Sequence, residues 1–161
     1  MTAMNRLTAG ALGAALARTL ALSGGAHAQS RNLEQRLAAA TQVDCTFAAL
    51  ATGTWDDAAP KAEVTAATLE ASFTAINVDE GTAEAGSTFG NTFISVRYAH
   101  GYLHFMQMSD AGPLYVTTIL AQETADGRMK AVQTRHEYSP AVIPGFTSRP
   151  EMYVGDCAVT S

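Results

Sequence analysis

From Cys45 onward the chain is a succession of short runs of β-branched and aromatic residues, interrupted by turn-forming residues. Gly, Asp or Pro recurs roughly every eight to twelve residues, which is the spacing of consecutive strands in an antiparallel sandwich or barrel. No internal repeat, low-complexity tract or linker divides this pattern. We therefore expect one all-β domain, an antiparallel β-barrel or a closely related sandwich.

One short helix is expected ahead of the strands. Residues 31–42 favour helix by propensity, and Leu33 and Leu37 are placed four residues apart, on one face of such a helix. A partly ordered lead-in to the first strand is the alternative.

The first of three predicted hairpins joins a strand over Phe73–Val78 to one over Thr82–Ala85. The three-residue connection 79–81 ends in Gly81, which suits a type I turn followed by a left-handed position.

The second predicted hairpin joins Phe93–Ala99 to Tyr102–Met108 through a two-residue turn at His100-Gly101. This turn places Tyr98 opposite Leu103 and Val96 opposite Phe105, which makes one face strongly apolar. The other face places Arg97 opposite His104.

The third predicted hairpin joins Leu114–Gln122 to Met129–Tyr138 around Asp126-Gly127, a strong turn pair. In a two-residue register, one inward face is shared by the following residues of both strands: Tyr115, Thr117, Ile119, Ala121, Val132, Thr134, His136 and Tyr138.

A proline-containing stretch, 139–150, follows the third hairpin, and a closing strand is expected over Met152–Val159. Three prolines exclude regular strand or helix in the stretch. Because Val142, Ile143 and Phe146 are too apolar for a solvated linker, we expect the stretch to pack across the barrel.

The N-terminus has the three parts of a secretory signal peptide: a short start with Arg6, an apolar run and an Ala26-His27-Ala28 ending. We expect residues 1–28 to be a cleaved signal and residues 29–161 to form a single β-barrel-like domain in the periplasm or outside the cell. The uninterrupted apolar run is too short to span a bilayer, so we expect no membrane span and a monomer.

Removal of the signal peptide lowers the count of basic residues from 10 to 8 against 15 acids, a net charge of −7. Only Lys61 and Lys130 are lysines. This balance argues against nucleic acid as a partner, since its binding needs clustered basic side chains.

Cys45 and Cys157 lie near opposite ends of the predicted domain. In an oxidising compartment an even number of cysteines predicts a disulfide; two unpaired thiols are the alternative. A redox role is not indicated, because the two residues do not form a C-x-x-C motif.

No catalytic or metal-binding motif is present, so we expect neither an enzyme nor a metal or other cofactor. The sequence lacks a G-x-S-x-G element and a Ser placed beside a His and an acid. His100, His104 and His136 could converge on zinc across strands, but their positions are equally those of surface and cross-strand histidines.

Polar and aromatic residues on a predicted core face suggest a ligand cavity, because a barrel of about eight strands can hold one small ligand. The residues expected to line it are Trp55, Tyr115, His136 and Tyr138. A filled core with hydroxyl groups bonded to one another is the alternative.

Two resemblances accompany these predictions. Gly53-Thr54-Trp55 resembles the G-x-W element at the start of lipocalin-type barrels, which implies a lipocalin-like barrel with Arg149, or less readily Arg135, stacked on Trp55. Residues 134–138 and 144–151, followed by Tyr153 and Gly155-Asp156-Cys157, resemble a group of small exported bacterial proteins without an assigned function, and the resemblance extends back to about Cys45. That second resemblance supplies no functional residues.

Two functions are therefore expected. The first is an envelope protein that binds a small, partly apolar ligand inside the barrel. The alternative is a protein–protein interaction module, such as an envelope structural factor or an inhibitor of a periplasmic hydrolase, which acts through the 139–150 loop.

Overall fold

A computed structural model describes residues 28–56, 59–87, 90–108, 112–138 and 149–161. The chain divides into two units, residues 1–32 and residues 33–161. Of the first unit only residues 28–32 are described, and they are helical. The expected signal peptide is therefore almost wholly outside the described residues, as is most of the 139–150 loop.

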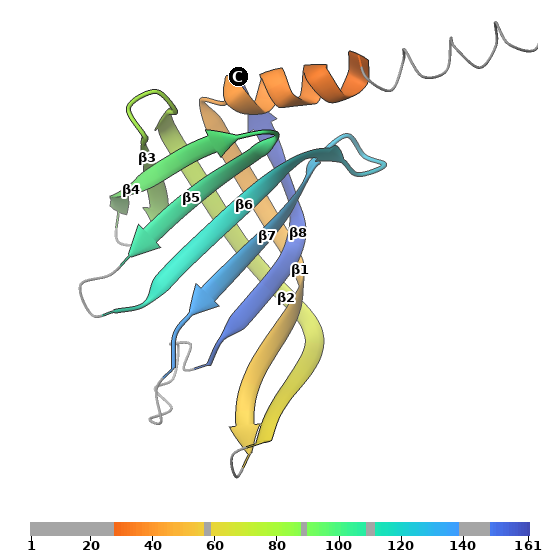
Figure 1. Ribbon diagram of the computed structural model, residues 1–161, viewed down its shortest axis with the longest axis vertical. Coiled ribbons are helices and arrows are strands. Elements are labelled where there is room, and N and C mark those ends of the chain that lie inside the picture. The colour runs from red at the N-terminus through yellow and green to blue at the C-terminus, as the bar shows by residue number, and fades with distance from the viewer. Residues whose placement is uncertain (1–27, 57–58, 88–89, 109–111, 139–148) are drawn as a thin grey trace, which may run out of the picture. The chain divides into compact units, whose positions relative to one another are not determined.

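The second unit is a closed antiparallel barrel in which each strand pairs with its neighbours in sequence and β1 pairs with β8 (Figure 1). This confirms the predicted all-β barrel class. The strands are β1 Gln42–Asp56, β2 Ala59–Asn77, β3 Thr82–Ser87, β4 Gly90–Ala99, β5 Tyr102–Met108, β6 Leu114–Glu123, β7 Met129–His136 and β8 Glu151–Thr160.

Helical residues end at position 38, four residues before β1 begins. The predicted helix therefore exists but stops short of residue 42. Leu33 and Leu37, the predicted apolar pair, are both buried in the main core. Arg36 binds Glu123 at the end of β6 at 2.7 Å, which fixes this helical turn against the barrel. No helix among the described residues has the length and apolarity needed to cross a membrane.

Most of the core lies in one half of the barrel, which we call the capped half. Its inward side chains are apolar, and they pack with Leu33 and Leu37. They come from seven of the strands and include Val43, Phe47, Ala83, Val96, Leu103, Ile119, Met129 and Cys157.

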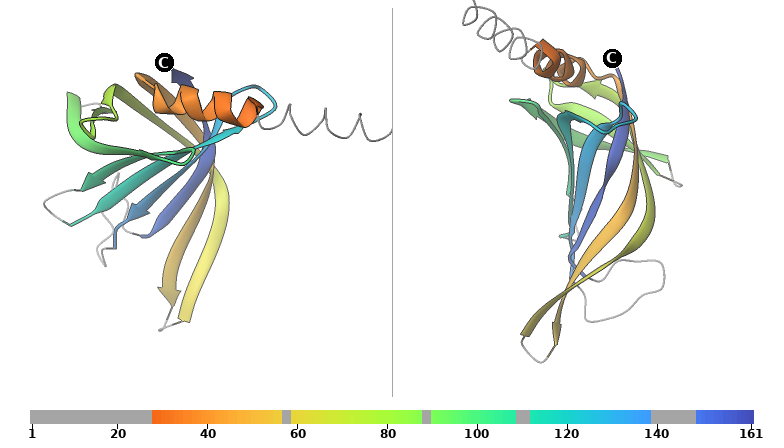
Figure 2. Two further views of the ribbon diagram at one scale, coloured as in Figure 1. Left: turned by 45° about the horizontal axis from the view of Figure 1, so that its top comes forward. Right: turned by 90° about the vertical axis from the view of Figure 1, so that its right-hand side faces the viewer.

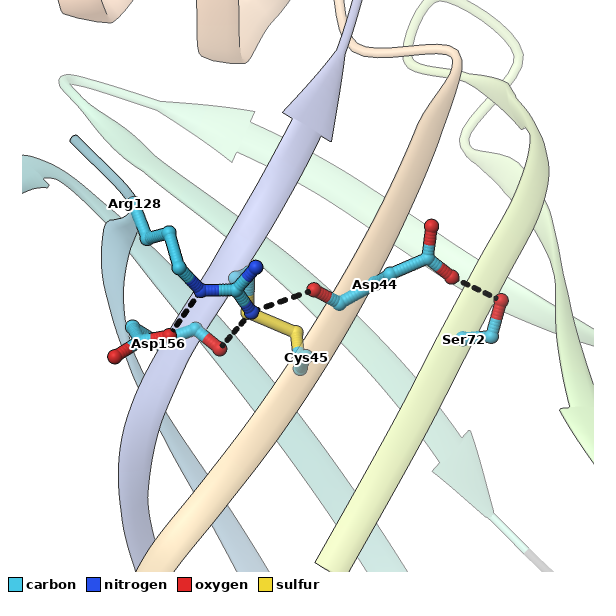
Figure 3. Close-up of a disulfide and its surroundings, with 6 residues drawn as sticks. Asp44, Cys45, Ser72, Arg128 and Asp156 are labelled. Atoms are coloured by element: carbon cyan, nitrogen blue, oxygen red, sulfur yellow. Dashed lines mark hydrogen bonds and ion pairs between the residues drawn. A yellow bond between two sulfur atoms is a disulfide. The ribbon is translucent and has the colours of Figure 1, made fainter. Parts of the chain in front are cut away.

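A disulfide between Cys45 and Cys157 joins the first strand to the last, as predicted. The two cysteines are directly paired in the β1–β8 ladder and are buried in the capped half. Beside them on the outer face, Arg128 forms an ion pair with Asp156 and donates to the carbonyl oxygen of Asp44 (Figure 3).

The first predicted hairpin is present, with a longer connection than expected. Asn77 pairs with Thr82, so four residues rather than three connect β2 and β3. Gly81 has a φ of 74°, as the predicted left-handed position requires. The carboxamide oxygen of Asn77 accepts from the backbone N–H of Glu80 and stabilises the turn.

The second hairpin has the predicted register. Val96 pairs with Phe105, Arg97 with His104 and Tyr98 with Leu103. His100 and Gly101 both have positive φ, as a two-residue type I′ turn requires. Val96, Leu103 and Phe105 are accordingly buried.

The register predicted for the third hairpin is wrong. Three residues, not two, connect the paired positions Thr124 and Arg128, because the backbone N–H of Thr124 donates to the carbonyl oxygen of Arg128. A change of one residue moves every side chain of a strand to the opposite face. β7 therefore turns Gln133 and Arg135 inward, while Thr134 and His136 face outward.

The barrel is least complete between β2 and β3. β2 pairs with β1 along almost its whole length, but its pairs with β3 among the described residues are confined to residues 73–77. We call residues 53–56 and 59–62 the β1–β2 extension; these residues of β1 and β2 continue together past the other strands (Figure 2).

Candidate functional site

The second half of the barrel, which we call the open half, contains a cavity of about 280 Å³. One side of its lining is apolar. Phe73 and Phe105 stack in parallel with their ring centroids 4.0 Å apart, and Leu69 and Ile94 also contribute. The polar inward side chains of the lining are Gln107, Tyr115, Thr117, Gln133 and Arg135.

Arg135 is held between two tyrosine rings. Its guanidinium carbon lies 5.7 Å from the ring centroid of Tyr115 and 5.1 Å from that of Tyr153. Glu151 is its direct partner across the β7–β8 ladder, and one carboxylate oxygen lies 3.9 Å from the guanidinium. Cation–π contacts and a carboxylate thus compensate the positive charge of Arg135 together.

Both tyrosines donate hydrogen bonds to carboxylates near Arg135. The hydroxyl of Tyr153 donates to Glu151 over 2.6 Å, and that of Tyr115 donates to Glu137 over 3.0 Å. Burial, followed by the bond to Glu151, raises the pKa of Tyr153 to about 12. Burial and the bond to Glu137 also raise the pKa of Tyr115. Both phenols are therefore neutral donors near pH 7.

Gln133 and Thr117 are the two buried polar residues of the cavity lining. The side chain of Gln133 is on the inward face beside Thr117, and only 9% of the residue is exposed. Its oxygen Oε1 is buried and has no hydrogen-bond partner among the described residues. Because a half-turn of the carboxamide exchanges its oxygen and nitrogen, either group can face the cavity and meet a polar occupant.

Of the four residues predicted to line a ligand site, Tyr115 lines this cavity. His136 is exposed and faces outward, as a consequence of the β7 register. Trp55 and Tyr138 are 54% and 63% exposed, and their rings contact each other edge to face at 5.6 Å. These two residues lie outside the cavity lining.

The predicted stacking of an arginine on Trp55 is not what the structure shows. Trp55 belongs to the β1–β2 extension, where its aromatic partner is Tyr138. Arg149 is exposed, and Arg135 lies over Tyr115 and Tyr153 instead. The register predicted for the third hairpin, with Thr134 and His136 inward, would have turned Arg135 outward, whereas Arg135 faces the interior.

The three histidines considered as zinc ligands occupy different structural positions. His100 forms the β4–β5 turn, and Nδ1 of His104 lies 3.0 Å from the hydroxyl of Thr118 on the outer face. His136 faces outward on β7. Among the described residues no group of three or more His, Cys, Asp or Glu side chains is arranged to hold a metal ion.

Sequence reasoning missed Gln133 and Arg135, the two β7 residues that define the polar side of the cavity. The available signal was their spacing from Met129 and Ala131, since all four positions alternate on one face. A three-residue connection at Ala125-Asp126-Gly127 would have placed that face inward.

Large apolar side chains are exposed on the outside of the barrel. They belong to the β1–β2 extension and its neighbours, and to the outer faces of β4, β5 and β8. They are Trp55, Val64, Phe93, Tyr102, Met108, Tyr138, Met152 and Val154.

Ile143 and Phe146, which were expected to pack across the barrel, lie outside the described residues. A scan of the chain against protein-family models found no match, and searches among curated proteins and solved structures found none either.

Proposed function

We propose that this protein binds one small, partly apolar ligand inside the open half of its barrel. The ligand would place its apolar body against Phe73 and Phe105 and its polar group beside Gln133 and Arg135. The cavity of about 280 Å³ is slightly smaller than the usual range for ligand pockets, which begins at about 300 Å³, and this favours a compact molecule.

The observation that carries this proposal is the buried carboxamide of Gln133. A buried polar atom without a partner costs about 1–3 kcal/mol, and Oε1 of Gln133 has none among the described residues. A polar occupant of the adjoining cavity would remove that cost. An apolar side chain of similar size at this position would avoid that cost.

The proposal includes export and a binding role without catalysis. The Cys45–Cys157 disulfide supports an oxidising compartment, and the three-part N-terminal segment supports delivery by a signal peptide. The periplasm or the extracellular space would be the place of binding, in agreement with the resemblance to small exported bacterial proteins.

The experiment is native mass spectrometry of the protein purified from cells that make it naturally. We expect an additional mass on the wild-type protein, and its loss from Gln133→Leu, which removes the polar group at nearly constant volume. Trp55→Ser, on the outer surface, is the matched control and should retain the mass. Wild-type protein that carries no bound molecule would contradict the proposal.

The alternative, a protein–protein interaction module, is favoured by a different surface. The edge of β2 over residues 59–70 has no β3 partner among the described residues, and Val64 is 76% exposed. An exposed strand edge can add a strand from another chain.

A photo-crosslinking residue at position 64 tests this alternative in producing cells. Tyr102, also exposed but on the outer face of β5, is the control position. Protein adducts at position 64 and not at position 102 would support strand addition. Equal labelling at the two positions would contradict it.

A further inference from the structure

We infer that the cavity selects ligands with an uncharged polar group, such as a carboxamide or an alcohol, over the matching anions. This inference rests on the proposed function and names the chemical class of its ligand.

The first support is the compensation of Arg135. An arginine in a cavity is ordinarily a receptor for carboxylates. Here a carboxylate oxygen of Glu151 lies 3.9 Å from the guanidinium of Arg135. The rings of Tyr153 and Tyr115 also cover the guanidinium, with their centroids 5.1 and 5.7 Å from its central carbon. The side chain of Glu151 is mostly buried, so water screens its charge weakly.

The second support is the local balance of charge. Glu137 is held beside Tyr115 by a 3.0 Å hydrogen bond, so in the described part of the chain the carboxylates of Glu137 and Glu151 both lie near the guanidinium of Arg135. An anionic ligand that approached Arg135 would therefore meet a net negative charge. It would also lose its hydration on entering the cavity, which an anion tolerates poorly without an unpaired cation.

The third support is the chemistry of the remaining polar lining. The inward-facing residues Gln133, Thr117 and Gln107 are all neutral, and each can both donate and accept hydrogen bonds. Glu70, the one acid among the cavity residues, is at an exposed position of β2. A carboxamide or alcohol can satisfy either orientation of the Gln133 carboxamide. A carboxylate only accepts, so it cannot supply the donor that Oε1 of Gln133 lacks.

Cinnamamide and cinnamate form a suitable pair of probes. They have the same planar apolar body, which matches the stacked Phe73 and Phe105, and they differ in the charge of the polar group at pH 7.5. Isothermal titration calorimetry on the purified wild-type protein should give at least tenfold tighter binding of cinnamamide. Gln133→Leu should weaken that binding by about tenfold or more, the loss expected for one buried hydrogen bond.

Glu151→Gln tests the cause of the selection. The substitution keeps the shape and the acceptor for Tyr153 but removes the charge that compensates Arg135. We expect cinnamate to gain at least tenfold in affinity in this variant, so that the preference falls or reverses. Glu63→Gln, at an exposed position of β2, is the matched control and should leave the preference unchanged. Thermal melts establish that both variants are folded.

Wild-type protein that binds cinnamate as tightly as cinnamamide would overturn the inference and leave the proposed function standing. Absence of binding by both probes would also overturn it as a statement of ligand class. The proposed function falls only when the protein from its natural source carries no bound molecule.

Discussion

The capped half and the open half of the barrel are built by the same strands and differ in what those strands turn inward. β7 places Met129 and Ala131 in the capped half and then Gln133 and Arg135 in the open half. β6 changes in the same way, from Ile119 to Tyr115. Stability and binding are therefore separated along each strand, not assigned to different elements.

The two halves also differ in how a buried side chain contributes to the free energy of unfolding. In the capped half each buried apolar group adds to the free energy of unfolding, by roughly 25 cal/mol for each Å² removed from water. In the open half Gln133 and the Arg135–Glu151 pair are buried at an energetic cost, which a ligand would offset. Substitutions in the two halves should thus have opposite consequences.

The largest effect is expected from loss of the disulfide. Replacement of Cys45 and Cys157 by Ala releases a 112-residue separation that the disulfide closes. In the chain-entropy model this lowers the free energy of unfolding by up to about 4–5 kcal/mol. Urea denaturation followed by circular dichroism measures the change. A midpoint equal to that of the oxidised wild type would show that pairing of β1 with β8 suffices without the covalent bond.

Leu37→Ala should be the next largest. Leu37 is fully buried between the helical turn and the barrel core, and truncation leaves a cavity there. We expect a loss of about 3 kcal/mol, within the usual range for Leu→Ala in a core, and no loss of ligand. Chemical denaturation gives the first quantity and native mass spectrometry the second. Loss of ligand from a folded variant would mean that the halves are not independent.

Alkaline pH should weaken the open half. The pKa of Tyr153 is raised from 10.0 to about 12, so between these values the folded state keeps a proton that the unfolded state releases. The free energy of unfolding must then fall as pH rises through this window, by roughly 2–3 kcal/mol for this group.

Urea denaturation at pH 9 and pH 11.5 measures this fall. Tyr153→Phe should reduce the fall, leaving a smaller part from Tyr115, whose pKa is also raised. A fall of the same size in Tyr153→Phe would assign the pH dependence to other groups.

Gln133→Leu should have the smallest effect on stability. It removes a buried oxygen without a described partner, so the free energy of unfolding of ligand-free protein should stay within about 1 kcal/mol of wild type, or rise. Thermal melts of delipidated protein give the value. A loss of stability as large as that of Leu37→Ala would show that Gln133 has a structural role in the barrel.

The fold class was predictable because strand-length patterns and turn residues are local. At His100-Gly101 the turn alone determined the pairing, and the apolar face of β4 and β5 followed from it. Asp126-Gly127 is an equally strong local signal, but it belongs to a longer connection. The hydroxyl of Thr124 and the backbone of Arg128 close that connection.

The site was less predictable because it depends on that one residue of register. The side chain of Arg128 is held by Asp156 and Asp44, which are remote in sequence, so nothing local reveals the length of the connection. Tyr115 was found because its own strand precedes the turn. Gln133 and Arg135 were missed because their strand, β7, follows the turn. Trp55 was misplaced because a three-residue resemblance cannot show that β1 extends past the barrel.

The direct pairing of Cys45 with Cys157 has a mechanical consequence. A pulling force applied at Gln42 and Thr160, which are neighbours in the β1–β8 ladder, would pass through the disulfide and leave the intervening chain unloaded. Only after reduction would the barrel bear the load and lengthen, by roughly 370–400 Å for the 112-residue separation. In an oxidising compartment the domain would thus act as a short, inextensible link whose contents are shielded from tension on its ends.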